Sequence, residues 1–308
     1  MKRDLVRPDT ALIDPDALGT EARDPANADL DLRSTAELVG LMNHQDATVP
    51  GAVAAAGSQI VGAVDAIAAR FAAGGRLVYV GAGTSGRLAA LDAAECETTF
   101  STPVARVLAL VAGGESASPA DQAAAEDDEE AGRVAIVASE VSAEDAVVAV
   151  SASGRTPYAV GALRAAHEAG ALTVSVVSVA DSELGRLAEH PIAVPVGPEL
   201  IAGSTRLKAG TAQKLVLNTI STVCMIRCGK TFGDLMVDVD ATNAKLRARV
   251  RRIVLLATGA TPEAVDEALA AADGSAKVAI VSLLAGVDAE DAHVRLQAAG
   301  DNVRRALE

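Results

Sequence analysis

The sequence predicts an α/β fold in which a mostly parallel sheet lies between two layers of helices, followed by a small helical bundle. Short Val-rich runs end in loops of Gly, Ser and Thr and are followed by helix-forming stretches, which is the pattern of a parallel sheet. Half of the 308 residues are apolar, but only 2% are aromatic and none is Trp. The core must therefore be built from Ala, Val, Leu and Ile, as where Ala-rich helices cover a Val-rich sheet.

Charge and cysteine content narrow the class of protein. The net charge of −14 argues against a general binder of nucleic acid or anionic membranes. The three cysteines, Cys96, Cys224 and Cys228, form no paired framework and indicate a reducing compartment. We expect Cys224 and Cys228 to be core thiols rather than metal ligands. Because there is no apolar run of about 18 residues and no apolar signal core, we expect a soluble cytoplasmic protein.

The first quarter of the chain leads into the sheet. Residues 1–33 carry three Pro and seven Asp without periodicity, and predict an extended arm or loosely packed lead-in. The capping-box spacing Ser-Thr-Ala-Glu opens a helix over residues 34–43. Pro50 precedes a longer helix over residues 53–73, which two glycines close. Residues 76–80 then form the first strand.

Strands and helices alternate through the middle of the chain. Four further apolar runs are predicted to be strands, and they span residues 104–111, 145–150, 172–178 and 191–196. The predicted helices between and after them span residues 88–95, 119–132, 157–170 and 203–227.

The pattern changes beyond residue 234. Four helices are expected there, over residues 242–256, 261–271, 277–284 and 288–299. The run at 277–284 has strand propensity, but its flanks favour a helix. The expected organisation is an arm and helix (residues 1–50), a sheet domain (51–235) and a C-terminal helical bundle (236–308).

The loop after the first strand, Gly81-Ala-Gly83-Thr84-Ser85-Gly86, is a candidate anion site. The first N–H groups of a helix lack internal partners, and the helix dipole places partial positive charge there. Glycine allows close approach of the backbone, and Thr84 and Ser85 add hydroxyl donors. The loop has neither the Walker ending nor Gly-x-Gly-x-x-Gly spacing. A tight strand-to-helix turn without a ligand is the alternative.

A second loop repeats this arrangement. Ser-Gly-Arg follows a Val-rich strand twice, at residues 85–87 and at residues 153–155. In one parallel sheet both loops lie at the same edge, where open α/β sheets bind ligands. The repeat therefore favours the anion site.

A third group of small hydroxyls, at residues 203–211, is predicted to open the long helix and carries two cations in an acidic chain. Ser204, Thr205 and Lys208 are candidates to hold a sugar phosphate or a carboxylate. Ordinary solvation of a helix end is the alternative.

Several motifs together resemble the N-acetylmuramic acid 6-phosphate etherases. They lie at residues 18–25, 81–88, 92–96, 153–157, 203–218, 233–239 and 241–246. The match runs from about residue 18 to the C-terminus, and the stretch at 203–218 is highly specific. The Ser-Gly loops alone indicate only the wider sugar isomerase (SIS) fold.

The resemblance implies a SIS-type three-layer αβα sandwich and a lyase that needs no cofactor or metal. Family members cleave the D-lactyl ether of N-acetylmuramic acid 6-phosphate to N-acetylglucosamine 6-phosphate and D-lactate, in peptidoglycan recycling. They are usually homodimers with active sites near the subunit interface. The related glucokinase regulatory proteins bind sugar phosphates without this chemistry.

The resemblance also implies roles for individual residues. Glu95 matches the acid that protonates the lactate oxygen and later activates water, and with its apolar neighbours we expect it to be buried; an ordinary Glu on the helix surface is the alternative. Glu126 matches the base at C2, with Asp127 as the alternative. Both belong to a run of five acids, which could instead be an ordinary solvated face. Two carboxylates suffice if their environments separate their pKa values. The matching substrate contacts are Thr84, Ser85, Ser151, Ser153, Ser204, Thr205 and Lys208.

One departure lies beside the proposed acid. Glu97 and Thr98 stand where the family usually has two prolines. The extra carboxylate either alters the pKa of Glu95 or points away from it.

Two other functions remain open on the same fold. An aldose–ketose isomerase for sugar phosphates also moves a C2 proton, but does not need an acid at Glu95. A non-catalytic sugar-phosphate-binding regulator keeps the loops and loses a carboxylate, whereas both carboxylates are present here. Residues 1–50 are acidic and supply no basic helix-turn-helix for a transcription regulator.

Overall fold

The computed structural model describes residues 19, 21–114, 119–239 and 243–308. Its centre is a five-stranded sheet in the order β2-β1-β3-β4-β5, and every neighbouring pair is parallel. The strands are β1 (Leu77–Gly81), β2 (Val107–Val111), β3 (Ala146–Ser151), β4 (Leu172–Val177) and β5 (His190–Ala193). The predicted parallel sheet is confirmed.

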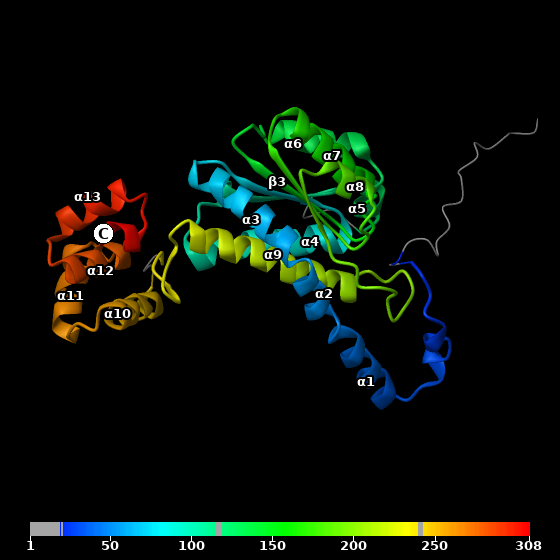
Figure 1. The fold of residues 1–308 in the computed structure, drawn as a ribbon, viewed down its shortest axis with the longest axis horizontal. Coiled ribbons are helices and arrows are strands. Elements are labelled where there is room, and N and C mark those ends of the chain that lie inside the picture. Colours follow the sequence, from blue (N-terminus) through cyan, green and yellow to red (C-terminus); the bar gives the residue numbers. More distant parts are fainter. Residues whose placement is uncertain (1–18, 20, 115–118, 240–242) are drawn as a thin grey trace, which may run out of the picture.

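Helices cover both faces of the sheet (Figure 1). On one face lie α3 (Gly57–Ala72), α4 (Gly83–Phe100) and α9 (Lys208–Arg227), and on the other α6 (Glu129–Ala138), α7 (Pro157–Glu168) and α8 (Glu183–Leu187). Successive strand side chains point to opposite faces, so Tyr79 packs in the first layer and its neighbours Val78 and Val80 in the second. The result is the predicted three-layer αβα sandwich.

The two Ser-Gly-Arg loops lie at the same edge of the sheet, as predicted. Gly81 at the end of β1 pairs with Val150 near the end of β3. The chain leaves β1 toward β2 and returns on the other side as β3. Such a reversal of strand order is where open α/β sheets bind ligands.

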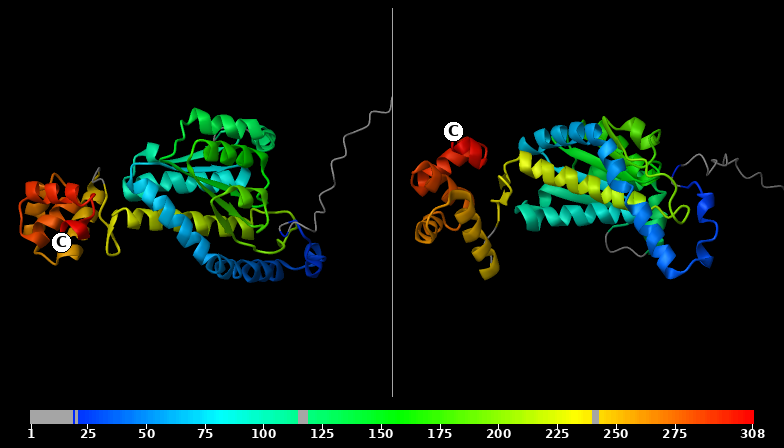
Figure 2. Two further views of the ribbon diagram at one scale, coloured as in Figure 1. Left: turned by 45° about the horizontal axis from the view of Figure 1, so that its top comes forward. Right: turned by 60° about the horizontal axis from the view of Figure 1, so that its bottom comes forward.

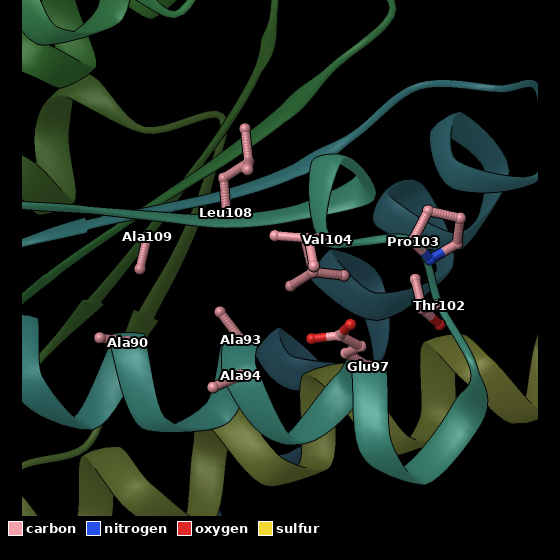
Figure 3. Close-up of a pocket in the computed structure, with 10 residues that line it drawn as sticks. Ala90, Ala93, Ala94, Glu97, Thr102, Pro103, Val104, Leu108 and Ala109 are labelled. Atoms are coloured by element: carbon pink, nitrogen blue, oxygen red, sulfur yellow. The ribbon is translucent and has the colours of Figure 1, made fainter. Parts of the chain in front are cut away.

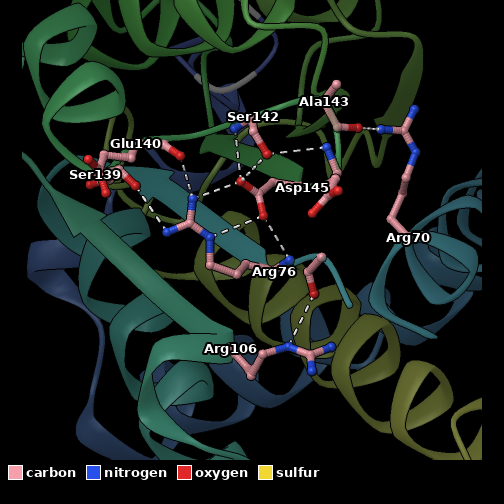
Figure 4. A network of polar contacts seen from close by, with 10 residues as sticks. Arg70, Arg76, Arg106, Ser139, Glu140, Ser142, Ala143 and Asp145 are labelled. Atoms are coloured by element: carbon pink, nitrogen blue, oxygen red, sulfur yellow. Dashed lines mark hydrogen bonds and ion pairs between the residues drawn. The ribbon is translucent and has the colours of Figure 1, made fainter. Parts of the chain in front are cut away.

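The opposite edge of the sheet is fixed by an ion pair that links β1 to β3 (Figure 4). Arg76 Nη2 lies 2.7 Å from Asp145 Oδ2, and the Arg76 backbone N–H donates to Asp145 Oδ1. Burial alone would raise the pKa of Asp145, but the bonds from Arg76 and from the Ser142 backbone hold it below its usual value. This network fixes the strands far from the candidate site.

The N-terminal helices differ partly from the prediction. The capping box at Ser34 is confirmed at the start of α1 (Thr35–Asp46). The single helix expected over residues 53–73 is wrong, because α2 (Val49–Ala55) and α3 are separate. Two short 3-10 turns, Pro25–Asn27 and Leu30–Leu32, precede α1, while residues 1–18 and 20 of the expected arm lie outside the described residues.

Three smaller differences concern the middle of the chain. The strand expected from residue 104 begins at Val107, after a 3-10 turn. The helix expected over residues 119–132 is two helices, α5 (Pro119–Glu126) and α6, because Asp128 caps a new start. A short hairpin of β6 (Thr231–Phe232) and β7 (Leu235–Met236) was not predicted.

The C-terminal helices have an apolar cluster of their own and lie apart from the sheet in all three views (Figures 1 and 2). They are α10 (Ala244–Thr258), α11 (Pro262–Ala271), α12 (Ala276–Ala285), α13 (Ala289–Ala298) and α14 (Val303–Ala306). The helix favoured over a strand at residues 277–284 is confirmed as α12. The buried amine of Lys277 lies within ion-pair distance of Asp238 and Asp301.

Taken singly, no helix of the described residues has the length and apolar character to cross a membrane. Two bent pairs meet the same criteria of length and composition together, residues 35–55 with 57–72 and residues 262–271 with 276–285.

Candidate active site

The loop between β1 and α4 has an open helix N-terminus. The N-cap residue, Ala82, has no side chain that can accept a hydrogen bond from the first turn. A Cβ added to Gly86 would lie 2.6 Å from the carbonyl oxygen of Gly81, so this strand and helix meet too closely for any larger residue. Because no side chain caps α4, its first backbone N–H groups can donate to an anion.

The hydroxyl of Ser85 is fixed by a buried residue of α9. Ser85 Oγ donates to Gln213 Oε1 at 3.0 Å. Gln213 is only 2% exposed, and among the described residues its Nε2 has no hydrogen-bond partner. Gln213 was not among the predicted site residues, because its only signal in the sequence is a polar residue on the inner face of an apolar helix.

The second loop is held by its own hydroxyls. Ser151 is buried; its Oγ lies 2.9 Å from Thr156 Oγ1 and accepts from the Gly154 backbone N–H. Ser153 is half-buried, and its Oγ accepts from the Arg155 backbone N–H at 3.2 Å. These bonds fix the shape of the loop between β3 and α7.

Glu126 lies where the two loops meet. It is the last residue of α5, and its Oε2 is 3.8 Å from the position that a Cβ would take on Gly83. Its carboxyl group also forms a hydrogen bond with Thr156. Burial, and then the neighbouring charge of Asp127, raise the pKa of Glu126. Asp127 itself is exposed.

The third predicted anion group has a different structure. α9 begins at Lys208, so the prediction that residues 203–205 open this helix is wrong. The buried carboxylate of Glu199 accepts from the backbone N–H groups of Lys208 and Ala209, both at 3.0 Å. The protein's own carboxylate thus occupies this helix N-terminus, and half-buried Ser204 and Thr205 lie in the turns before it.

The side chain of Lys208 is 5% exposed. Burial lowers its pKa, while the charges of Glu199, Asp24 and Asp46 oppose that shift. The turn that contains Thr205 still adjoins the first loop, since a Cβ on Gly210 would lie 3.5 Å from the Thr205 carbonyl oxygen and 3.8 Å from Thr84 Cγ2. Thr84 and Thr205 are therefore neighbours, whereas Lys208 is surrounded by acidic residues.

Glu95 is exposed, so the prediction that it is buried is wrong. It lines an open cavity of about 340 Å³ between α4, α9 and the β6–β7 hairpin. The helix buries Asp92, Ala93 and Cys96. Because successive residues of a helix point about 100° apart, apolar neighbours in the sequence do not cover Glu95.

A buried carboxylate that the sequence analysis missed forms the wall of the same cavity. Asp92 is 4% exposed and accepts three hydrogen bonds, from Tyr79 Oη at 2.8 Å, Asn218 Nδ2 at 2.7 Å and Ser221 Oγ at 3.1 Å. Burial raises its pKa, and these bonds oppose that shift. An Asp one turn before Glu95 on an Ala-rich helix was the available signal.

The extra carboxylate of Glu97 points away from the Glu95 cavity. It lines a different pocket of about 260 Å³ on the other side of α4, with Thr102, Pro103 and Val104 (Figure 3). The sequence left open whether Glu97 alters the pKa of Glu95 or points away from it, and the structure shows that it points away.

The cysteines are free thiols. Cys96 and Cys224 are buried, and Cys228 is partly buried. Burial raises the pKa of Cys96 to about 12, so it stays protonated beside Glu95. Among the residues that the structure describes, no three His, Cys, Asp or Glu side chains are grouped to hold a metal ion.

The structure thus brings Glu126 to the two hydroxyl loops but leaves Glu95 far from them. Glu95 is twelve residues beyond Gly83 on one continuous helix. At a rise of 1.5 Å per residue, their backbones are about 18 Å apart.

Comparisons with known proteins give two kinds of match: family models match the sheet region, and relatives match nearly the whole chain. Residues 124–222 match the model of the SIS domain, and residues 59–167 match that of the glucokinase regulatory protein N-terminal SIS domain. The chain is 55% identical to an N-acetylmuramic acid 6-phosphate etherase of Streptomyces avermitilis, over 95% of this chain and 94% of the relative. Relatives with the same name share 56% identity in Rubrobacter xylanophilus (94% and 96% covered) and 50% in Mycolicibacterium smegmatis (96% and 99%).

Proposed function

This chain belongs to the N-acetylmuramic acid 6-phosphate etherase family, and from that premise we propose which of its residues carry the reaction. The enzyme is a lyase that cleaves the ether between C3 of the sugar phosphate and D-lactate. The products are N-acetylglucosamine 6-phosphate and D-lactate. The observation that carries the proposal is Glu126, a half-buried carboxylate that lies between two loops of hydroxyl and N–H donors.

The 6-phosphate binds at the β1–α4 loop. The uncapped N–H groups of α4 and the hydroxyls of Thr84 and Ser85 are donors of the kind that phosphate requires. Ser153 adds a half-buried hydroxyl from the second loop, and Thr205 adjoins Thr84. Buried Ser151 holds the second loop through Thr156 and Gly154, and Lys208 is buried at the start of α9.

Glu126 acts as the base at C2. In the open-chain sugar, the C2 hydrogen is adjacent to the C1 aldehyde, which stabilises the negative charge left when the proton is removed. A general base is most efficient when its pKa approaches the working pH. Burial and the charge of Asp127 move the pKa of Glu126 in that direction.

Glu95 acts as the acid at C3. The departing lactate oxygen is a poor leaving group, so it needs a proton as the C3–O bond breaks. A protonated carboxyl supplies that proton, and the resulting carboxylate then activates the water that adds to the double bond at C3. Glu95 is exposed in the single chain, so excluding water from the departing oxygen needs a cover that the described residues do not supply.

We propose that a homodimer supplies this cover. Exposed apolar side chains lie beside Glu95, with Leu91 53% exposed on α4 and Ile226 46% exposed on α9. We also propose that the enzyme works in the cytoplasm, in the recycling of a cell-wall sugar, which fits its three free thiols.

The experiment is release of D-lactate from N-acetylmuramic acid 6-phosphate by the purified protein. We expect wild type, Glu97→Gln and Asp127→Asn to form lactate and N-acetylglucosamine 6-phosphate in equal amounts. We expect Glu95→Gln and Glu126→Gln to lose about 10²-fold or more of the rate. A ketose phosphate without lactate would instead indicate an isomerase. Saturable binding without any product would indicate a regulator.

A further inference from the structure

We propose that Gln213 positions Ser85 for the phosphate by turning its side-chain amide over when the phosphate binds. In the turned-over state Gln213 Nε2 donates to the Ser85 hydroxyl, which in turn donates its own proton to the phosphate. The inference rests on the proposed function, because it concerns how the β1–α4 loop holds the 6-phosphate. Gln213 acts through Ser85 and is therefore a positioning residue.

The hydroxyl of Ser85 gives its proton to a protein group and not to the open side of the loop. Ser85 Oγ donates to Gln213 Oε1 at 3.0 Å, and a hydroxyl has only one proton to donate. The oxygens of a phosphate dianion can only accept hydrogen bonds. While Ser85 donates to Gln213, it therefore presents only lone pairs to a phosphate. Binding of the anion at this half-buried hydroxyl requires that the bond to Gln213 be reversed or broken.

Gln213 has the group that a reversed bond needs. Its side chain is 2% exposed, and among the described residues its Nε2 has no hydrogen-bond partner. An unsatisfied buried donor is a cost to the fold, so packing alone does not explain an amide at this position. The neighbouring positions on the inner side of α9 are all apolar and buried: Ala209, Ala212, Val216 and Leu217.

Reversal of the bond needs no change in packing. A half-turn about the Cγ–Cδ bond of a glutamine exchanges its oxygen and nitrogen, and this torsion allows both orientations. The separation of 3.0 Å from Ser85 Oγ also lies within the range of an N–H···O bond. After the half-turn, Gln213 donates to Ser85 and Ser85 donates to the phosphate. Hydrogen bonds that follow one another in the same direction strengthen each other.

The experiment compares the binding of N-acetylglucosamine 6-phosphate to wild type and to Gln213→Met by titration calorimetry. Met has about the length of Gln but cannot donate to Ser85. We expect Kd to rise about tenfold, which is about 1.4 kcal/mol. The urea midpoint of Gln213→Met should stay at or above the wild-type midpoint, because the variant loses an unsatisfied donor.

A purely structural glutamine predicts the reverse result. Gln213→Met would then have a lower urea midpoint and an unchanged Kd, and this outcome would overturn the proposal. The matched control is Gln297→Met, at an exposed position on α13, which should change neither quantity.

Ser85→Ala tests whether Gln213 acts through the hydroxyl. In that background Gln213→Met should change Kd by less than about twofold, because no hydroxyl is left to position. The same tenfold loss in both backgrounds would mean that Gln213 acts independently of Ser85, and would contradict the proposal.

The half-turn itself can be followed by NMR of protein labelled with ¹⁵N at the glutamine side chains. The Gln213 NH₂ pair is identified by its absence from the spectrum of Gln213→Met. Saturation with N-acetylglucosamine 6-phosphate should move one proton of the pair downfield in wild type but not in Ser85→Ala. A pair that does not move in wild type would show that the amide does not turn over.

Failure of this inference is distinct from failure of the proposed function. If wild type releases lactate and Gln213→Met binds the sugar phosphate as tightly, the inference alone is overturned. If wild type binds the sugar phosphate without releasing lactate, the proposed reaction is overturned, and a raised Kd in Gln213→Met still supports the inference. If wild type binds no sugar phosphate, both are overturned.

Discussion

The buried carboxylate of Asp92 joins the elements that line the cavity beside Glu95, and its contribution to stability can be predicted quantitatively. It joins β1, α4 and α9 through Tyr79, Asn218 and Ser221. Asp92→Ala would leave the Tyr79 hydroxyl, which is fully buried, without an acceptor. An unsatisfied buried group costs about 1–3 kcal/mol. With the packing lost around Asp92, we expect the free energy of unfolding to fall by about 2–4 kcal/mol.

The assay is urea unfolding followed by far-ultraviolet circular dichroism at one protein concentration, because the chain has no Trp. Tyr79→Phe in the Asp92→Ala background removes the orphaned hydroxyl. The double variant should therefore lose at least about 1 kcal/mol less than the sum of the two single losses. Asp65→Ala, an exposed Asp on α3, is the control and should change stability by less than about 0.5 kcal/mol.

The raised pKa of Asp92 also predicts how the stability difference between wild type and Asp92→Ala changes with pH. Because burial raises the pKa of Asp92, the folded protein holds this proton more tightly than the unfolded chain does. The stability that the group contributes is present below its ordinary pKa and is lost as pH rises through the raised value. The difference between wild type and Asp92→Ala should therefore be larger at low pH. Additive losses, or a difference that grows with pH, would refute the reasoning.

Three further predictions concern the loops and the start of α9. Asp127→Asn removes a charge that raises the pKa of Glu126. The acid limb of the pH profile of kcat/KM should therefore move to lower pH, and an unmoved limb would mean that Glu126 is not the titrating base. Glu199→Ala removes the carboxylate that caps α9 and should lower the free energy of unfolding by about 1–2 kcal/mol in urea; no loss would deny its capping role. Gln213→Leu frees the Ser85 hydroxyl and should raise KM about tenfold, a loss of about 1.4 kcal/mol in binding free energy. The control Gln297→Leu, at an exposed position on α13, should leave KM unchanged. Equal KM values for the two variants would exclude Gln213 from positioning the loop.

The sheet and its loops could be predicted because their signals are local. A Val-rich strand, a Gly-Ser loop and a helix start lie within a dozen residues of each other. The loops after β1 and β3 therefore lie at one edge, as expected, with Gly81 paired to Val150. The capping box at Ser34 is equally local and is confirmed.

The errors arose where the structure depends on distant residues or on helix geometry. The start of α9 is set by Glu199, nine residues before Lys208, and not by the small hydroxyls at 203–205. Glu95 was expected to be buried because its sequence neighbours are apolar, yet those neighbours point to other sides of the helix. The same geometry turns Glu97 away from the Glu95 cavity.

The separation of Glu95 from Glu126 was also beyond sequence reasoning. Motifs that match a family give the identity of the residues but not the distances between them in the fold. The separation follows from the length of α4 and from the position of Glu126 Oε2, 3.8 Å from where a Cβ would lie on Gly83.

The fate of the C2 hydrogen tests the central claim most directly. Wild-type protein is given N-acetylmuramic acid 6-phosphate in deuterium oxide, and the product is examined by NMR. Removal of the C2 proton by Glu126, followed by hydration, predicts that N-acetylglucosamine 6-phosphate carries deuterium at C2, and that Glu126→Gln incorporates none. Release of lactate with the original hydrogen still at C2 would contradict the account, because the ether would then break without the base on which the site is built.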